Sequence, residues 1–104
     1  MINIQISEYG TKNYYQNGNR HRETGPAIVI FPGDHFWYNI GQLHRANGPA
    51  ITRSDGSYAW YNQGQRHRTD GPAIKWPDGT LEYWINGNRV SEYEIMFING
   101  TGHD

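Results

Sequence analysis

One 23-residue unit, repeated in phase, constrains this chain more than any other feature of its sequence. Residues 33–55 read GDHFWYNIGQLHRANGPAITRSD and residues 56–78 read GSYAWYNQGQRHRTDGPAIKWPD, so the two segments agree at 13 of 23 positions. Residues 10–32 carry a third copy, and residues 79–101 begin in phase as GTLEYWINGNR before they diverge. A constant period of this length is typical of repeat proteins, in which each unit contacts only its neighbours. We therefore expect a single domain, 1–104, that consists of a leader (1–9), four repeats (10–32, 33–55, 56–78 and 79–101) and a short tail.

Two turn signals in every unit predict a run of antiparallel strands. The glycines of these signals are Gly18, Gly41, Gly64 and Gly87 after the aromatic pair, and Gly33, Gly56 and Gly79 between units. Asn-Gly and Asp-Gly, which occur at several of these turns, favour hairpins because glycine adopts positive φ without steric cost. No segment has an apolar period of 3.6 residues long enough to predict a helix. The expected fold is therefore all-β, an antiparallel meander of about eight or nine strands.

The two ends of the array differ from the inner units. In the leader, isoleucine alternates with polar residues (INIQI), which predicts a strand in phase with the second half of a repeat, closing one edge of the sheet. The fourth unit has Val90-Ser91 in place of His-Arg and Glu94-Ile95-Met96 in place of Gly-Pro-Ala. Terminal repeats diverge because they cap an array. We interpret the fourth unit as a cap with an apolar second strand, and its missing His-Arg pair suggests that this pair is not needed for a unit to fold.

The tripeptide Gly-Pro-Ala recurs in the second half of the first three units. Proline cannot donate a hydrogen bond to a strand ladder, and glycine weakens a strand, so the pair predicts a bulge or bend at this point. The alanine that follows is small, as is required where two layers or strands approach each other closely.

An aromatic pair stands at the same position of every unit. The four pairs are Tyr14-Tyr15, Trp37-Tyr38, Trp60-Tyr61 and Tyr83-Trp84. Adjacent residues of a strand point to opposite faces, so the pairs predict two ladders of rings, one on each face of the sheet. We expect one ladder to cover the core and the other to remain for solvent, a second layer or a partner.

A His-Arg pair in the first three units supplies the candidate chemistry. Its members are His21, His44 and His67 with Arg22, Arg45 and Arg68. Successive histidines would lie two strands apart, roughly 9–10 Å, whereas a zinc ion needs ligands about 2 Å away. The histidines are therefore too far apart to share a metal ion, and we predict no metal site and no cofactor. Because no serine or threonine recurs beside the histidines as a nucleophile, we also predict no catalytic site. The arginines either pair with carboxylates within the sheet or bind carboxylates or phosphates of a ligand, and both alternatives stay open.

The segment WYNQGQRHRTDGPAIKWPDG resembles a variant of the MORN repeat (membrane occupation and recognition nexus), in which an aromatic residue, an Asn-Gly turn, a short polar strand and an Asp-Gly turn follow one another. The His-Arg-x-x-Gly-Pro-Ala form is similar to repeats of small phage and large-virus proteins and of bacterial MORN-like antitoxin components. The resemblance implies an elongated, twisted antiparallel sheet used for protein contacts, with no common catalytic residue. The usual unit carries further glycines where this chain has His-Arg, so lipid binding is not carried over.

Charge and composition exclude several classes of function. The formal net charge of -1 argues against general nucleic-acid binding, because no basic field is present to attract a polyanion. The chain has no cysteine, which excludes disulfides and zinc-thiolate sites. The segment MINIQISEY has neither the basic start nor the apolar run of a signal peptide, and no stretch is apolar enough to insert into a membrane. We expect a cytoplasmic protein, in the host cytoplasm if the chain is viral.

These observations predict a non-catalytic protein-binding module, such as a small inhibitor or antitoxin-like protein, and the resemblance implies that it is encoded by a phage and counteracts a host or defence protein. The alternatives are a binder of an anionic small molecule or nucleotide between the aromatic and arginine ladders, and a structural component that assembles or oligomerises through its sheet edges. Aromatic residues and arginine are the types enriched in binding hot spots. The residues expected to carry binding are Trp37, Tyr38, Trp60, Tyr61, Arg22, Arg45, Arg68, His44 and His67.

Overall fold

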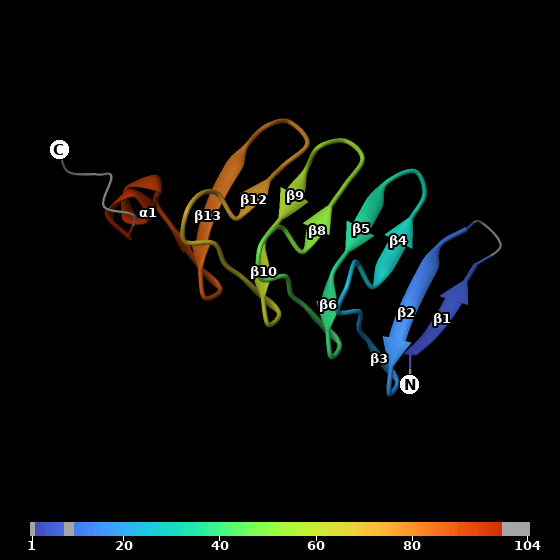
Figure 1. Cartoon of the computed structure of the whole chain (residues 1–104). Coiled ribbons are helices and arrows are strands. Elements are labelled where there is room, and N and C mark those ends of the chain that lie inside the picture. The colour runs from blue at the N-terminus through green and yellow to red at the C-terminus, as the bar shows by residue number, and fades with distance from the viewer. Residues whose placement is uncertain (1, 8–9, 99–104) are drawn as a thin grey trace.

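The computed structural model of the chain, which describes residues 2–7 and 10–98, is an elongated array of β-hairpins that follow one another from the N-terminal end to a short helix (Figure 1). Its principal extents are 53 × 28 × 19 Å. Nine antiparallel strands follow one another in the main sheet, which confirms the predicted all-β meander. They are β1 (Ile2–Ile6), β2 (Lys12–Gln16), β4 (Ile28–Ile30), β5 (Asp34–Phe36), β8 (Ile51–Thr52), β9 (Tyr58–Ala59), β12 (Ile74–Lys75), β13 (Leu81–Ile85) and β14 (Asn88–Val90).

Each inner unit bends where its long strands are interrupted. In the second unit, β5 belongs to the main sheet, and a separate hairpin of β6 (Tyr38–Asn39) and β7 (Gln42–Leu43) continues from it. Residues 44–50 then leave the ladder, and β8 returns to the sheet beside β5. The third unit repeats this arrangement with β10 (Tyr61–Asn62) and β11 (Gln65–Arg66). In the first unit β2 is uninterrupted, and β3 (Asn19–Arg20) pairs directly with it. The segment outside the ladder contains Gly-Pro-Ala, so the bend predicted there is present.

The first turn of each unit has the backbone that the Asn-Gly signal predicts. Asn17 and Gly18 have φ angles of 52° and 82°, and Ile40 and Gly41 have φ angles of 47° and 80°. Two consecutive residues with positive φ are the mark of a type I′ hairpin, whose twist matches that of the strands. Ile40 is the outlier among these residues, because a β-branched side chain is strained in this conformation.

The leader is a half-unit, as the sequence predicts. In β1, Ile6 lies opposite Lys12 of β2, as Val29 of β4 lies opposite His35 of β5 one unit later. The turn that follows β1 begins at Ser7, whose backbone N–H donates to the Thr11 carbonyl at 2.9 Å. Residues 8 and 9, within the expected leader, and residues 99–104, at the end of the fourth repeat and in the tail, lie outside the described part of the chain.

The core is thin and consists of small residues. Ala27, Ala50 and Ala73, the alanines of the three Gly-Pro-Ala segments, are each completely buried, and Ile74 is 4% exposed. Among the described residues, no large side chain is fully buried. The alanines are therefore the points of closest approach that the sequence predicts, and stability must come from contacts at half-buried positions.

The prediction that the chain contains no helix is wrong, because the second half of the fourth unit forms α1 (Glu92–Ile98) instead of an apolar strand. Ser91 Oγ accepts a hydrogen bond from the Glu94 N–H at 3.3 Å, and Glu94 Oε2 accepts one from the Ser91 N–H at 3.2 Å. This reciprocal pair is a capping box, which satisfies N–H groups that a helix start leaves free. Ile95 is buried at 4% exposure and anchors the helix. In the part of the chain that the structure describes, no helix is both long and apolar enough to cross a membrane.

Candidate binding groove

Each arginine of the His-Arg pairs is clamped within its own unit. The guanidinium carbon of Arg45 lies 4.0 Å from the centroid of the Trp37 ring, and its Nη1 donates to the Pro49 carbonyl at 3.3 Å. Stacking of a guanidinium on an aromatic face contributes about 0.5–2 kcal/mol, depending on its exposure to water. The same two contacts recur in the neighbouring units, for Arg22 with Tyr14 and Pro26, and for Arg68 with Trp60 and Pro72.

The glycine three residues after each arginine leaves room for this clamp. A Cβ added to Gly48 would lie 2.9 Å from the guanidinium carbon of Arg45, closer than real Cβ contacts occur. The corresponding distance is 3.1 Å at Gly25 and 2.9 Å at Gly71. The Arg-x-x-Gly spacing therefore has a packing reason, the close approach of the guanidinium, which adds to the strand-weakening effect that we attributed to these glycines.

Each histidine joins one unit to the next. His44 Nδ1 accepts a hydrogen bond from the Gln63 N–H at 3.0 Å, so its ring is neutral with the proton on Nε2. The acceptor reaches a hairpin residue with positive φ in the following unit. His21 makes this contact with Ile40 at 3.1 Å, and His67 makes it with Asn86 at 3.0 Å.

These contacts correct our interpretation that His-Arg is not needed for a unit to fold. The fourth unit lacks the pair, and it is also the unit whose second half leaves the repeat structure for a helix. Ser91 and Glu94 occupy the positions that Arg68 and Gly71 have one unit earlier. Replacement of the clamp by a capping box therefore accompanies the change from strand to helix.

Arginines also cover the second ring of several aromatic pairs. The guanidinium carbon of Arg20 lies 5.7 Å from the Tyr38 centroid, and that of Arg66 lies 4.9 Å from the Trp84 centroid. Arg66 Nε also donates to the Tyr61 hydroxyl at 3.3 Å. All eight rings of the two ladders are half-buried. Arginine side chains therefore shield rings of both ladders, and the expectation that one ladder remains for solvent, a second layer or a partner stays a prediction.

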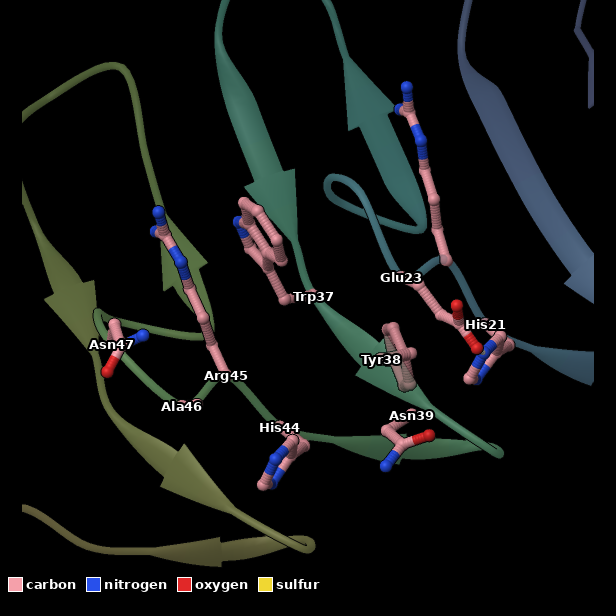
Figure 2. Close-up of a pocket in the computed structure, with 10 residues that line it drawn as sticks. His21, Glu23, Trp37, Tyr38, Asn39, His44, Arg45, Ala46 and Asn47 are labelled. Atoms are coloured by element: carbon pink, nitrogen blue, oxygen red, sulfur yellow. Dashed lines mark ion pairs between the residues drawn. The ribbon is translucent and has the colours of Figure 1, made fainter.

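Two neighbouring pockets nevertheless open between the units, and together they form what we call the groove. The first, with a volume of about 510 Å³, lies between the first and second units (Figure 2). In Figure 2 Tyr38 and Asn39 come from β6, Trp37 comes from the link between β5 and β6, and His44 and Arg45 come from the segment that returns beside them. The second pocket, of about 370 Å³, has the same position one unit later. Ala46 is exposed and lines both pockets, which makes it the boundary between them.

The groove is rich in hydrogen-bond donors and carries little net charge. Its two carboxylates lie beside basic side chains of the groove: Glu23 Oε1 is 3.6 Å from Nε2 of the His21 imidazole, and Asp70 Oδ1 accepts from Arg68 Nε at 2.7 Å. The bond from Arg68 lowers the pKa of Asp70 below the usual range of an aspartate, so this side chain is ionised at neutral pH. Three arginines and two carboxylates, with neutral histidines, leave a formal charge of +1 over both pockets.

All nine residues predicted to carry binding line the groove. The first pocket contains Arg22, Trp37, Tyr38, His44 and Arg45, and the second contains His44, Arg45, Trp60, Tyr61, His67 and Arg68. Sequence reasoning missed Ala46, Asn39 and Asn62. The two asparagines follow the aromatic pairs of the inner units as Trp-Tyr-Asn, and this shared tripeptide is the signal that marks them.

Among the described residues, no group of three or more His, Cys, Asp or Glu side chains is arranged to hold a metal ion. Comparison of the chain with family models, with curated proteins and with solved structures gave no match. The resemblance to MORN repeats therefore stays a prediction based on the residues quoted above.

Proposed function

We propose that this chain is a non-catalytic protein-binding module that holds its partner in the groove. The observation that carries the proposal is the repetition of one pocket, lined by the same unit positions, in two neighbouring places. A repeated pocket offers a ligand the same set of contacts twice, which suits an extended chain better than one compact molecule. The rings and arginines that line it are the residue types that dominate the energetics of protein interfaces.

The finer form of the proposal is a small inhibitor or antitoxin-like protein that acts in the cytoplasm, of the host if the chain is viral. It is supported by the resemblance of its repeats. The anionic small molecule or nucleotide is the less favoured candidate, since a formal charge of +1 over two pockets is a poor match for a nucleotide. Assembly through the sheet edges uses neither pocket and leaves their repetition without a function.

A test of the groove must leave its arginines and histidines in place, because these side chains also hold the units together. Ala46→Trp is suited to this purpose, since Ala46 is exposed and an indole there would enter both pockets. The matched control is Lys75→Trp, which adds the same ring at an exposed position that lines neither pocket of the groove.

The three proteins would be immobilised at equal density, and retained host proteins would be identified by mass spectrometry. We expect a protein retained by the parent and by Lys75→Trp to be lost with Ala46→Trp, while all three melt at similar temperatures. Equal retention of that protein by a folded Ala46→Trp variant would contradict the groove as the binding surface. Retention of a nucleotide by the parent alone would favour the second candidate.

A further inference from the structure

We infer that the groove recognises a proline-rich segment in the polyproline II conformation, lying along the array with side chains i and i+3 in neighbouring pockets. The inference rests on the proposed function and names the class of partner. It follows from three properties of the groove, namely the distance between its pockets, its excess of donors, and its aromatic walls with low net charge.

The first property is the distance between the pockets. Each unit adds two strands to the main sheet, and strands lie about 4.7–4.9 Å apart, so equivalent points of successive units lie about 9.5 Å apart there. Backbone bonds from the Gly41 N–H to the Arg20 carbonyl and from the Gly64 N–H to the Leu43 carbonyl continue this stacking into the hairpins that line the pockets. A polyproline II helix rises about 3.1 Å per residue with three residues per turn, so residues i and i+3 lie on one side about 9.3 Å apart. In a β-strand, residues on the same side repeat at about 6.7 Å and fall out of step with the pockets. The three-residue period therefore matches the array.

The second property is the hydrogen-bonding character of the walls. Asn39, Asn62 and Arg45 line the pockets with side chains that carry N–H groups, and the His44 ring has its remaining N–H at Nε2 because Nδ1 accepts from the Gln63 N–H. A ligand that suits these donors presents free acceptors and few N–H groups. Proline-rich chains do so, since polyproline II has no internal hydrogen bonds and proline has no N–H.

An α-helix offers a weaker match to the same walls. Its residues i and i+7 rise about 10.5 Å and lie on one side, which is close to the distance between the pockets. Its carbonyl groups, however, are already bonded within the helix, so they do not meet the donors of the groove. The helical ligand therefore becomes the comparison against which the inference is tested.

The third property is the combination of half-buried rings with a charge near neutrality. Trp37 and Trp60 have the same position in successive repeats, and each lines one of the two pockets. Both are half-buried, so part of each residue remains exposed. Aromatic-lined grooves receive proline-rich segments because the ligand is already ordered and loses little entropy on binding. With a formal charge of +1, the groove does not require a strongly acidic ligand.

The test uses the full chain and three synthetic peptides of similar length. The probe is L-(Pro-Pro-Ala)₄, its mirror image D-(Pro-Pro-Ala)₄ is the matched control, and an alanine-rich helix with leucines at i and i+7 represents the alternative. Binding is followed by fluorescence anisotropy of labelled peptides and by the indole N–H signals of Trp37 and Trp60 in two-dimensional NMR. The mirror image has the same composition but the opposite hand, so it separates recognition of the helix from general stickiness.

We expect the L-peptide to bind with a Kd of about 1 mM or tighter, to shift both indole signals, and to bind at least tenfold more tightly than its mirror image. Ala46→Trp should weaken this binding at least tenfold, whereas Lys75→Trp should leave it unchanged. Equal binding of the two mirror forms, tighter binding of the helical peptide, or no binding of the L-peptide would overturn the inference. Those outcomes leave the proposed function standing, because its own test is the loss of a host protein from the Ala46→Trp variant.

Discussion

The third and fourth units begin alike and end differently. Both run from an Asp-Gly turn through an aromatic pair to a type I′ hairpin. Their strands β9 and β13 both pair with β12. The third unit then clamps Arg68 against Trp60 and returns to the sheet, whereas the fourth closes a capping box between Ser91 and Glu94 and forms α1. The buried isoleucines of the two segments are not equivalent, because Ile74 follows Ala73 in the third unit whereas Ile95 has the position of Pro72 in the fourth.

Polar contacts also distinguish the second halves of the two units. Arg68 needs a glycine three residues later, and the proline next to that glycine has no N–H to give to a helix. Ser91 needs an acceptor side chain three residues later, and Ile95 supplies the N–H that a helix uses. Each arrangement is incompatible with the other at the same positions. The following changes are ordered from the largest expected effect to the smallest.

Removal of one clamp should cause the largest loss of stability. Arg45→Ala removes the stacking on Trp37 and leaves the Pro49 carbonyl without its donor, which should lower the free energy of unfolding by about 2–4 kcal/mol. Urea denaturation followed by tryptophan fluorescence measures this loss. Arg89→Ala, an exposed arginine of the fourth unit, is the control and should cost less than about 0.5 kcal/mol. Equal midpoints for the two variants would show that the clamp does not stabilise the unit.

Loss of a histidine acceptor should weaken one junction between units. His44→Leu leaves the Gln63 N–H without its partner, and we expect a cost of about 1–3 kcal/mol. His44→Asn serves as the matched control, since its Oδ1 offers an acceptor near the position of Nδ1 and should recover part of the loss. Hydrogen exchange of the Gln63 amide reports the junction directly, and unchanged protection in His44→Leu would contradict the role given to the histidine.

The capping box of the fourth unit should have a smaller and more local effect. Ser91→Ala removes the acceptor for the Glu94 N–H, at a cost of about 1 kcal/mol, and should increase fraying of α1. Limited proteolysis near Tyr93, together with the helical circular dichroism signal, follows this change. Ser54→Ala, on an exposed turn of the second unit, is the control. A helix signal that survives Ser91→Ala at full strength would mean that burial of Ile95 alone holds the helix.

The smallest expected effect is a gain. Ile40→Asn replaces a strained β-branched residue at a φ of 47° by the residue found at the same point of the first and fourth units, and it should stabilise the protein by about 1 kcal/mol. Gln63→Asn, at the same position of the third unit, should gain less because glutamine is not β-branched. Thermal melting compares the two variants. A destabilised Ile40→Asn protein would indicate that the side chain of this exposed isoleucine makes a contact whose loss outweighs the relief of backbone strain.

The repeat could be predicted well because turn chemistry and period act locally. Glycine and asparagine at Asn17-Gly18 and Asn86-Gly87 specify their hairpins almost without regard to the rest of the chain. The helix could have been found from Ser91-x-x-Glu94, a capping-box signal that precedes an apolar run. We missed it because the phase of the repeat favoured another strand, and the seven residues of α1 are too few to display a helical period.

The residues predicted to carry binding all line the groove, whereas their contacts with one another were not predicted. The phase of the repeat is enough to bring Trp37, His44 and Arg45 to one region. It does not reveal that Arg45 folds back over the ring of its own unit, or that His44 reaches the turn of the next unit, because both depend on side-chain rotamers in three dimensions. The side chains proposed to bind a partner are therefore the same ones that pack the array, and a sequence pattern alone cannot separate the two roles.

The histidine bridges also bear on how the chain acquires its structure. Each bridge spans 19 residues, and the bond from the Gly41 N–H to the Arg20 carbonyl spans 21, so the junctions close loops of less than one period. Loops of this size form quickly, and topologies built from local contacts fold faster than those that need distant ones. In such an array each unit interacts with its nearest neighbours, and the imidazole of a folded unit accepts a hydrogen bond from the hairpin of the next unit. Insertion of another copy of residues 56–78 should therefore add one more junction of the same kind, which closes a loop of the same length as the others.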